Sequence, residues 1–401
     1  MDGSVDLWRR SGCAWLTGRE DGAPNDGGHP AAAYAHRVAT DIGRLSATLG
    51  SNVELDGSSI LAERSVHTQF RRGGRQSCNR TTQLLTCSDG HVSLTIARTE
   101  DRDLLAASFE TTLAGSDDVW DFAKQQCAHR SVEEVRDRVT VLGLSAAILG
   151  EAHSADHVGH VGHVGTYAAA GTRRERPVVI DLSSLWAGPL AANVLGLVGA
   201  EIVKVESVDR PDGARRGSPT FYDLLHGGHQ SVTLDFASQP TALHALLAAA
   251  DVVITSARPR AFDQLGIDPD QLMREHPITA WISITGFGAR QPNRIGFGDD
   301  AAIAAGLCAF DHDGPMFAAD AIADPLTGLT AASIVLDALV TGKRVHADLA
   351  LADVARAAAV AEPFVPGTGE TSSTETAALP RSRPVRARAP LPGAHNDRWL
   401  T

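Results

Sequence analysis

The sequence predicts an α/β protein that combines a doubly wound, Rossmann-like parallel sheet domain with a smaller α+β domain. From residue 177 onward, short apolar runs such as VVIDL (178–182) and EIVKVE (201–206) alternate with stretches of helical periodicity. Strands that alternate with helices in this way are typical of βαβ units, in which the strands are parallel. The first 150 residues have a hairpin and helices in a different order, which indicates the α+β domain.

Two elements stand out in the first 150 residues. LLTCSDGHVSLTIAR (84–98) places Asp89 and Gly90 between alternating apolar runs, which predicts a β-hairpin. SVEEVRDRVTVLG (131–143) begins with the capping-box pair Ser131 and Glu134, and it predicts a helix that stops at the following glycine. Residues 151–176 are rich in glycine and alanine without apolar periodicity, so they are interpreted as a linker.

The sheet domain is predicted over residues 177–360. A helix with an early proline follows VVIDL, and DVVIT (251–255) and WISITGFG (281–288) supply two further strands. Residues 361–401 predict a mostly disordered tail, because their Pro, Ser, Thr and Arg cannot bury enough apolar surface to order it. The C-terminal stretch APLPGAHNDRWLT is the part of this tail that could dock.

Composition excludes several classes of partner. The formal net charge is -12 without a basic run, so neither a nucleic-acid partner nor a membrane surface is predicted. Five scattered cysteines without CxxC spacing argue against a disulfide framework or a zinc cluster, and they suit a reducing cytoplasm. Four histidines of the linker have spacing that could gather a metal, but a glycine-rich segment without a carboxylate framework predicts none: His153, His157, His160 and His163.

Asp324 stands directly before Pro325 and a long apolar helical pattern. Aspartate is a favoured N-cap and proline suits the first helical position, so the local pattern alone predicts a helix cap. A helix N-terminus also stabilises negative charge, and the same position therefore suits a reactive carboxylate.

The sheet half resembles a known family. VVIDLSSLWAGPLAANVLGLVGAEIVKVES is similar to the opening of the family III CoA-transferases, the CaiB/BaiF family, which includes formyl-CoA transferase, the carnitine CoA-transferases and α-methylacyl-CoA racemase. The resemblance continues in order through PDGARRG, SVTLDF, ADVVITSARPRAFDQLGI, WISITGFG, GFGDDAAIAAG and ADPLTGLTAASIVLDALVTGKRVHADLALADV, and it covers about 177–356. APLPGAHNDRWL is similar to the family's C-terminal segment.

The resemblance implies an acyl-CoA:carboxylate CoA-transferase that works as a homodimer. Asp324 falls on the family's aspartate, which attacks the thioester of acyl-CoA and forms first a mixed anhydride and then an aspartyl-CoA thioester. CoA and acyl-CoA are then substrates, a carboxylic acid is the acceptor, and no metal or permanently bound cofactor is implied. The family's glycine loop would supply N–H donors to an oxyanion, and its nearest match is RRGGRQS (71–77), with Gly73 and Gly74.

The resemblance also predicts contacts to CoA. Trp186 could stack on adenine or be a core side chain, and the arginines could meet the phosphates. The predicted CoA-binding residues are Leu185, Trp186, Ala187, Arg215, Arg216, Arg258, Arg260 and Gln264. His229 and Gln230 stand where the family usually has Lys-Arg, which removes two cations.

The order of the pieces departs from the family and leaves two alternatives open. Text similar to the smaller domain precedes the sheet here, and SGCAWLTGREDGAP (11–24) echoes a segment whose second version is AGLCAFDHDGPMF (305–317). Residues 1–150 are therefore interpreted as a truncated family copy fused to the sheet domain. One alternative function is a catalytically inactive CoA-binding partner subunit. The other is an acyl-CoA racemase, which is disfavoured by Phe297 in the histidine's place unless Asp299 or Asp300 substitutes.

Overall fold

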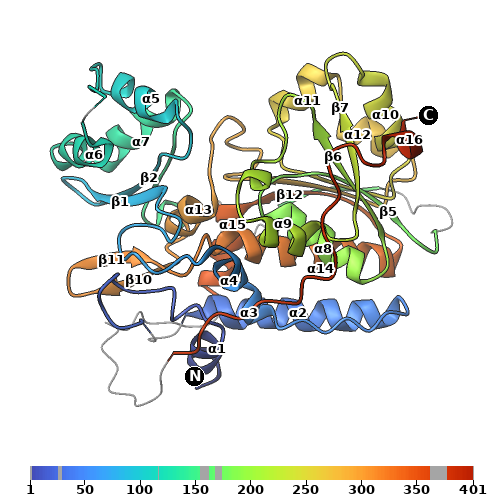
Figure 1. The fold of residues 1–401 in the computed structure, drawn as a ribbon, viewed down its shortest axis with the longest axis horizontal. Coiled ribbons are helices and arrows are strands. Elements are labelled where there is room, and N and C mark those ends of the chain that lie inside the picture. The colour runs from blue at the N-terminus through green and yellow to red at the C-terminus, as the bar shows by residue number, and fades with distance from the viewer. Residues whose placement is uncertain are drawn as a thin grey trace.

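A computed structural model describes the chain over residues 2–25, 29–115, 117–153, 162–167, 174–361 and 377–400. A large sheet with helices on both faces forms one end of the molecule, and a small lobe with its own sheet forms the other (Figure 1). The predicted pairing of a parallel sheet with a smaller antiparallel unit is therefore present.

Seven strands form the large sheet in the order β4-β12-β9-β8-β5-β6-β7. Every neighbouring pair is parallel except β4 and β12, so six strands are parallel as predicted. The strands are β4 (Gly162–Tyr167), β5 (Val178–Leu182), β6 (Glu201–Ser207), β7 (Gln230–Leu234), β8 (Val252–Thr255), β9 (Ala280–Thr285) and β12 (Arg344–Ala350).

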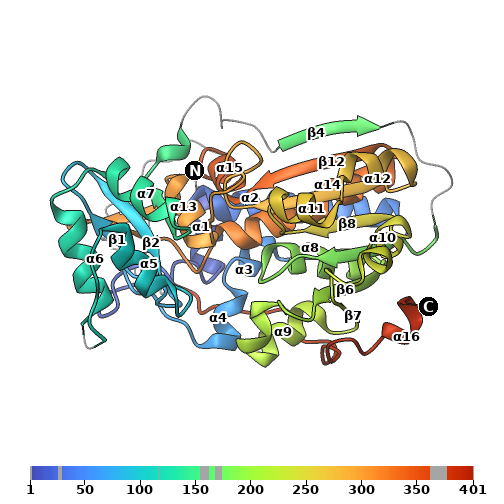
Figure 2. The ribbon, with the colours of Figure 1, turned by 90° about the horizontal axis from the view of Figure 1, so that it is seen from above.

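Helices cover both faces of this sheet because its strands are apolar on both sides. On one face, Val179 and Ile282 pack with α8 (Ala187–Leu197) and α14 (Ala323–Thr341). On the other face, Ile180 packs with helices that include α10 (Pro240–Ala248) and α12 (Pro269–Glu275) (Figure 2). Among the described residues α14 alone is long and apolar enough to cross a membrane, and most of it is buried inside the protein.

The remaining helices and strands of the sheet half complete these layers. They are α9 (Pro219–His226), α11 (Pro259–Leu265), α13 (Gly298–Ala304), the hairpin β10 (Cys308–Asp311) and β11 (Gly314–Phe317), α15 (Leu351–Ala359) and α16 (Asn396–Trp399), with short 3₁₀ turns at Glu151–His153 and Gly213–Arg216. In α14, a Cβ at Gly328 would lie 2.6 Å from the carbonyl oxygen of Ala187, so this glycine lets α14 and α8 approach closely.

The small lobe is an antiparallel sheet of β1 (Thr82–Thr86), β2 (His91–Thr95) and β3 (Ser145–Ile148). The predicted hairpin is β1–β2, and the helix predicted after Ser131 is α7 (Val132–Val141), whose first turn is capped by the Ser131 hydroxyl accepting the Glu134 N–H. Two further helices pack on this lobe, α5 (Asp101–Ser108) and α6 (Val119–Ala128).

The first seventy residues do not pack with this lobe, although the sequence groups them with it. They form α1 (Asp2–Arg10), α2 (Pro30–Thr48), α3 (Gly57–Ile60) and α4 (Glu63–Thr68). Ile42 and Leu61 of this region share one apolar cluster with Leu329 of α14. Residues from both ends of the chain therefore build the same core, with α2 lying along α14 (Figure 1).

The segment interpreted as a linker contains a strand. β4 pairs antiparallel with β12, Arg344 being opposite Tyr167 and Asp348 opposite Gly162. Backbone groups at the free edge of β12 need partners whatever the side chains of the added strand, which is why apolar periodicity did not predict it.

Residues 377–400 of the tail are ordered, although the sequence predicts a mostly disordered tail over residues 361–401. Arg383 forms a two-pronged ion pair with Glu63, at 2.7 and 2.9 Å, and Glu63 is buried in the N-terminal region. Farther along, the His395 N–H donates to the Ser231 carbonyl, and the Asn396 amide bonds both the N–H and the carbonyl of Thr233 on β7. Charge pairing and edge-strand hydrogen bonds hold this segment in place, together with the packing of Trp399 and Leu400 against the apolar cluster of the sheet.

Candidate active site

Asp324 is not the cap of its helix. The N-cap of α14 is Ile322, no side chain caps the helix, and Asp324 is the second helical residue with its own N–H donating to the carbonyl of Ala321. The cap interpretation of this aspartate is therefore wrong. Its carboxylate is left without a capping bond and lies in the first turn, where the helix dipole favours negative charge.

A pocket of about 270 Å³ opens onto Asp324. Ser184 follows β5, Ser256 follows β8 and Gly286 follows β9, so three parallel strands present their carboxyl ends to this space. Ligands of doubly wound sheets bind at such edges. Phe297, directly before α13, completes the wall nearest the aspartate.

Gly298 lies against the Asp324 carboxylate. A Cβ added at this glycine would be 2.4 Å from Oδ2 of Asp324 and 2.5 Å from the carbonyl oxygen of Ala321. Both approaches are far below van der Waals contact, so only glycine fits between α13 and the aspartate. The Gly298 backbone N–H also favours the ionised carboxylate and acts to lower its pKa.

Burial raises the pKa of Asp324 to about 7, against the ordinary value near 3.8. The positive charge of Arg64 opposes the rise, and the negative charge of Asp320 adds to it. A carboxyl with this pKa is partly ionised at neutral pH and is a stronger base than an exposed aspartate. Perturbed carboxyls in pockets are frequently functional groups.

Arg64 of α4 brings a positive charge that acts on Asp324 and lowers its pKa. Its guanidinium donates two hydrogen bonds to Asp320, at 2.7 and 2.5 Å, and Asp320 is fully buried. The same guanidinium lies 4.8 Å from the ring centre of Trp186. Burial works against the charge of Arg64, but the acidic neighbours raise its pKa above the ordinary value.

The loop that leads into Asp324 is strained. Ala319 and Ala321 both have positive φ, 56° and 44°, which is unfavourable for a residue with a Cβ. The Ala319 N–H donates to the Thr17 hydroxyl at 2.9 Å, and the Cys78 thiol donates to the Ala319 carbonyl at 3.3 Å. Groups from distant parts of the chain therefore hold the backbone from which Asp324 projects.

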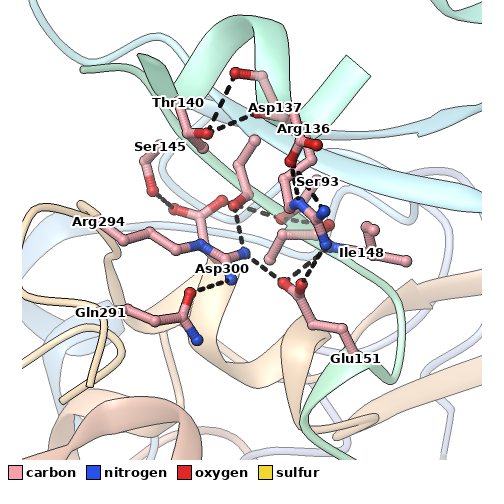
Figure 3. Close-up of polar contacts among 12 residues, drawn as sticks. Ser93, Arg136, Asp137, Thr140, Ser145, Ile148, Glu151, Gln291, Arg294 and Asp300 are labelled. Carbon is pink, nitrogen blue, oxygen red and sulfur yellow. Dashed lines mark hydrogen bonds and ion pairs between the residues drawn. The ribbon is translucent and has the colours of Figure 1, made fainter. Parts of the chain in front are cut away.

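Two further carboxyls lie on α13 but do not line the pocket. Asp299 accepts the Ala321 N–H at 3.0 Å, and burial with the nearby charge of Asp320 raises its pKa to about 8. Asp300 accepts three hydroxyls of the small lobe, from Ser93, Thr95 and Ser145 (Figure 3). Since both are engaged elsewhere, neither substitutes for the histidine that a racemase would need here.

The predicted glycine loop lies away from the pocket. The Gly74 N–H donates to the carbonyl of Gly18 at 2.9 Å, and neither Gly73 nor Gly74 lines the pocket. The structure does not place these glycines at the pocket, so their role as oxyanion donors stays a prediction from the resemblance. The neighbouring Arg72 explains their placement, because its guanidinium donates to three carbonyls in residues 15–22 and fixes the loop there.

The residues predicted to contact CoA are only partly brought together. Leu185, Ala187 and Arg258 line the pocket, and Arg260 lines the adjoining cleft. Trp186 is 1% exposed and packs edge-on against Phe221, so stacking on adenine is wrong and its core role holds.

Arg215 is already paired. It binds Glu206 through two nitrogens and covers the Tyr222 ring at 4.6 Å. Arg216 and Gln264 are exposed and line neither space. Sequence reasoning missed Arg64, Asp320 and Gly298, because Arg64 and Asp320 are 256 positions apart and no local pattern joins them.

Comparisons with known proteins identify the family of the sheet half. A model of CoA-transferase family III matches residues 177–386, just over half of the 401 residues. The chain is 31% identical over 201 residues to a succinate–glutarate CoA-transferase of Agrobacterium fabrum, covering 44% of this chain and 50% of that protein. It is 34% identical over 140 residues to a probable fatty acyl-CoA transferase of Mycobacterium tuberculosis, covering 32% and 35%.

A solved CaiB/BaiF family protein from Brucella suis is 29% identical, with a TM-score of 0.42 over 45% of this chain and 53% of that one. The chain spans half or less of the length of the curated relatives named above. The region that the family model matches, residues 177–386, lies in the sheet half, which carries Asp324.

Proposed function

The chain belongs to CoA-transferase family III, and on that premise we propose that it transfers CoA from an acyl-CoA to a free carboxylic acid with Asp324 as nucleophile. The observation that carries the proposal is the Asp324 carboxylate itself, which is uncapped, half-buried and part of a pocket at the strand ends. We propose that the reaction occurs in the cytoplasm. That the protein works as a homodimer stays a prediction from the resemblance to the family.

The reaction balances in four steps around one carboxylate. An oxygen of Asp324 attacks the thioester carbonyl, which forms a mixed anhydride and releases CoA thiolate. The thiolate then attacks the Asp324 carbonyl, frees the donor acid and leaves an aspartyl-CoA thioester. The acceptor carboxylate attacks that thioester to form a second anhydride, and the returning thiolate takes the acceptor's acyl group and restores Asp324.

The chain's own groups support these steps. Arg64 keeps part of the Asp324 population ionised, and the Gly298 N–H is placed to stabilise negative charge on its oxygens. Leu185, Ala187 and Gly188 line the pocket just after β5, and the pantetheine arm of CoA would lie against them. Pocket walls that exclude water protect the anhydride and thioester from hydrolysis.

Intact-protein mass spectrometry tests the proposal. The full chain is incubated with acetyl-CoA, propionyl-CoA or succinyl-CoA in the absence of acceptor, and the labelled peptide is mapped. We expect an adduct of CoA mass on Asp324 with at least one donor, released by hydroxylamine. Asp324→Asn should give none, while Asp337→Asn on the same helix should label normally. Binding of CoA without any adduct would contradict the transferase and favour a CoA-binding protein.

A further inference from the structure

Two of the five cysteines lie together in the small lobe. Cys87 directly follows β1, and Cys127 lies in the last turn of α6, which packs beside β1 (Figure 1). Both belong to the apolar cluster of this lobe, both are free thiols, and their exposed fractions are 6% and 1%. Neither lines the Asp324 pocket, so the proposed transfer of CoA does not use this pair.

Hydrogen bonds beside each cysteine hold the two segments together. The N–H and the hydroxyl of Ser88 both donate to the carbonyl of Arg130 at 2.9 Å, which joins the residue after Cys87 to the end of α6. The Cys87 N–H donates to the Gly90 carbonyl at 2.8 Å, and the Arg130 N–H donates to the Cys127 carbonyl at 3.0 Å. A disulfide forms without distortion only where the two backbones already lie close together, and these contacts meet that condition.

The two thiols contact each other, and the contact makes them unequal. The Cys127 thiol donates a hydrogen bond to the Cys87 sulfur, which lowers the pKa of Cys87. The same contact, together with burial, raises the pKa of Cys127. Cys87 therefore ionises first, and the thiolate is the form of cysteine that reacts with oxidants. Cys87 is also the more exposed of the two, next to the exposed turn residues Ser88 and Asp89.

The other three cysteines are in a different situation. Burial raises the pKa of Cys13 and of Cys308 to about 12, and it also raises the pKa of Cys78. The Cys78 thiol donates to the backbone carbonyls of Leu16 and Ala319. Within the part of the chain that the structure describes, none of the three has a second thiol among the groups that shift its pKa. Buried, protonated thiols of this kind are inert at neutral pH.

We propose that Cys87 and Cys127 form a peroxide-sensitive dithiol that closes into a reversible disulfide between the β1–β2 hairpin and α6. The Cys87 sulfur attacks one oxygen of hydrogen peroxide, the O–O bond breaks, and the leaving hydroxide takes up the proton that Cys87 released. The Cys127 sulfur then attacks the sulfur of the resulting sulfenic acid, the S–O bond breaks, and this hydroxide takes up the Cys127 proton. One peroxide is thus reduced to two waters while two thiols are oxidised to one disulfide.

The bond would fix the small lobe internally. It closes residues 88–126 into a loop that contains β2 and α5, which restricts the unfolded chain more than the folded one. A thiol reductant reverses it by thiol–disulfide exchange. In a reducing compartment the pair is therefore a dithiol at rest, and the disulfide is a transient response to oxidant.

Peptide mapping of the full chain tests the proposal. The reduced protein is treated with hydrogen peroxide, its remaining thiols are blocked with N-ethylmaleimide, and its peptides are analysed by mass spectrometry without reductant. We expect one dominant crosslink, between Cys87 and Cys127, that dithiothreitol removes. Cys308→Ser, in the separate hairpin β10–β11, should keep this crosslink. The same treatment in urea should spread crosslinks over all five cysteines, because the unfolded chain no longer selects one pair.

Two variants test the separate roles of the thiols. In Cys127→Ala no second thiol resolves the sulfenic acid, so it should accumulate on Cys87 and be trapped by dimedone. In Cys87→Ala the remaining Cys127 should stay reduced. We expect dimedone labelling of Cys87 in the first variant to exceed that of Cys127 in the second by at least about tenfold.

The results on the unaltered protein decide the proposal even if a variant fails to fold. Absence of the Cys87–Cys127 crosslink in the folded protein overturns it, and so does a mixture of crosslinks like that obtained in urea. Equal dimedone labelling in the two variants overturns the assignment of Cys87 as the attacking thiol. None of these measurements depends on the transfer of CoA, so this proposal and the proposed function are tested separately.

Discussion

Residues 177–361 carry Asp324 and every residue that lines its pocket, whereas residues 11–78 carry Thr17, Arg64 and Cys78, which hold the loop in front of it. One part of the molecule supplies the carboxylate that we propose as the nucleophile, and the other supplies a positive charge near it and restraint of the backbone in front of it. The difference shows that the N-terminal half, which the family model does not cover, is part of the candidate site.

We expect the largest effect from removing Arg64, which tests whether the N-terminal residues contribute to the site. In Arg64→Met, Asp320 is left as a buried charge without its partner, which costs about 3–5 kcal/mol of folding free energy. The pKa of Asp324 should also rise, because Arg64 acts to lower it. We expect adduct formation at pH 7 to fall by about a hundredfold, measured by quench and mass spectrometry.

Three variants control for simple unfolding. Arg64→Lys keeps the charge and should recover part of the rate, and Arg44→Met, at an exposed arginine of α2, should match the unaltered protein. The double variant Arg64→Met/Asp320→Asn removes both charges and should regain stability without regaining the rate. An Arg64→Met protein with normal stability and normal adduct formation would show that the N-terminal half is not needed for the site.

The close contact between Gly298 of α13 and the Asp324 carboxylate gives a test that lies wholly within the sheet half. In Gly298→Ala the new methyl group would meet the carboxylate at 2.4 Å and push it from its place. We expect adduct formation to fall by about a hundredfold, since small displacements of reacting groups have effects of this size. Gly115→Ala, where nothing lies within 4 Å, is the control. A normal rate in Gly298→Ala would mean that this carboxylate is not the nucleophile.

The pH dependence of adduct formation reports the pKa of Asp324, which burial raises and the charge of Arg64 lowers. Asp324 must be ionised to attack, and burial raises its pKa to about 7. The rate should therefore increase roughly tenfold between pH 6 and pH 8 and then level off. A rate that is flat over this range would contradict the raised pKa.

The smallest expected effect concerns Asp299 and is on the pH dependence of folding stability. It tests separately whether burial raises the pKa of a carboxyl in this region. Its pKa is raised to about 8, so between about pH 4 and pH 8 the folded protein keeps a proton that the unfolded chain has lost. Stability from this group therefore falls as pH rises. Asp299→Asn does not titrate and keeps the acceptor for the Ala321 N–H.

We expect the stability of Asp299→Asn relative to the unaltered protein to increase by more than about 1 kcal/mol from pH 5 to pH 8 in urea denaturation. Asp337→Asn, at an exposed site on α14, should show no such trend. A constant difference between the two pH values would disprove the burial argument for Asp299.

The sequence predicted the parallel strands and Asp324 because each depends on local signals. The runs at β5, β6, β8 and β9 are apolar over their full length, and the ADPLTG motif is contiguous. β4 could not be predicted, because backbone pairing at the edge of β12 requires no side-chain pattern.

The site residues that the sequence missed depend on contacts between distant segments. Arg64 meets Asp320 across 256 positions, and Gly298 is essential only because α13 meets α14 beside Ala321. Gly73 and Gly74 match the family's glycine loop in sequence, but they lie away from the pocket because Arg72 binds carbonyls in residues 15–22 and holds their loop there. The sequence shows which reactive residue types are present, whereas packing between distant segments determines which of them lie at the pocket.

The ion pair between Arg383 and Glu63 has a consequence for biosynthesis. During translation, Glu63 leaves the ribosome long before its partner is made, and it remains a charge that the emerging core cannot enclose at low cost. Its neighbour Arg64 belongs to the same short helix, so we expect that helix to become stable only once residue 383 is available to pair. Until then the candidate site would lack the positive charge that Arg64 brings to Asp324.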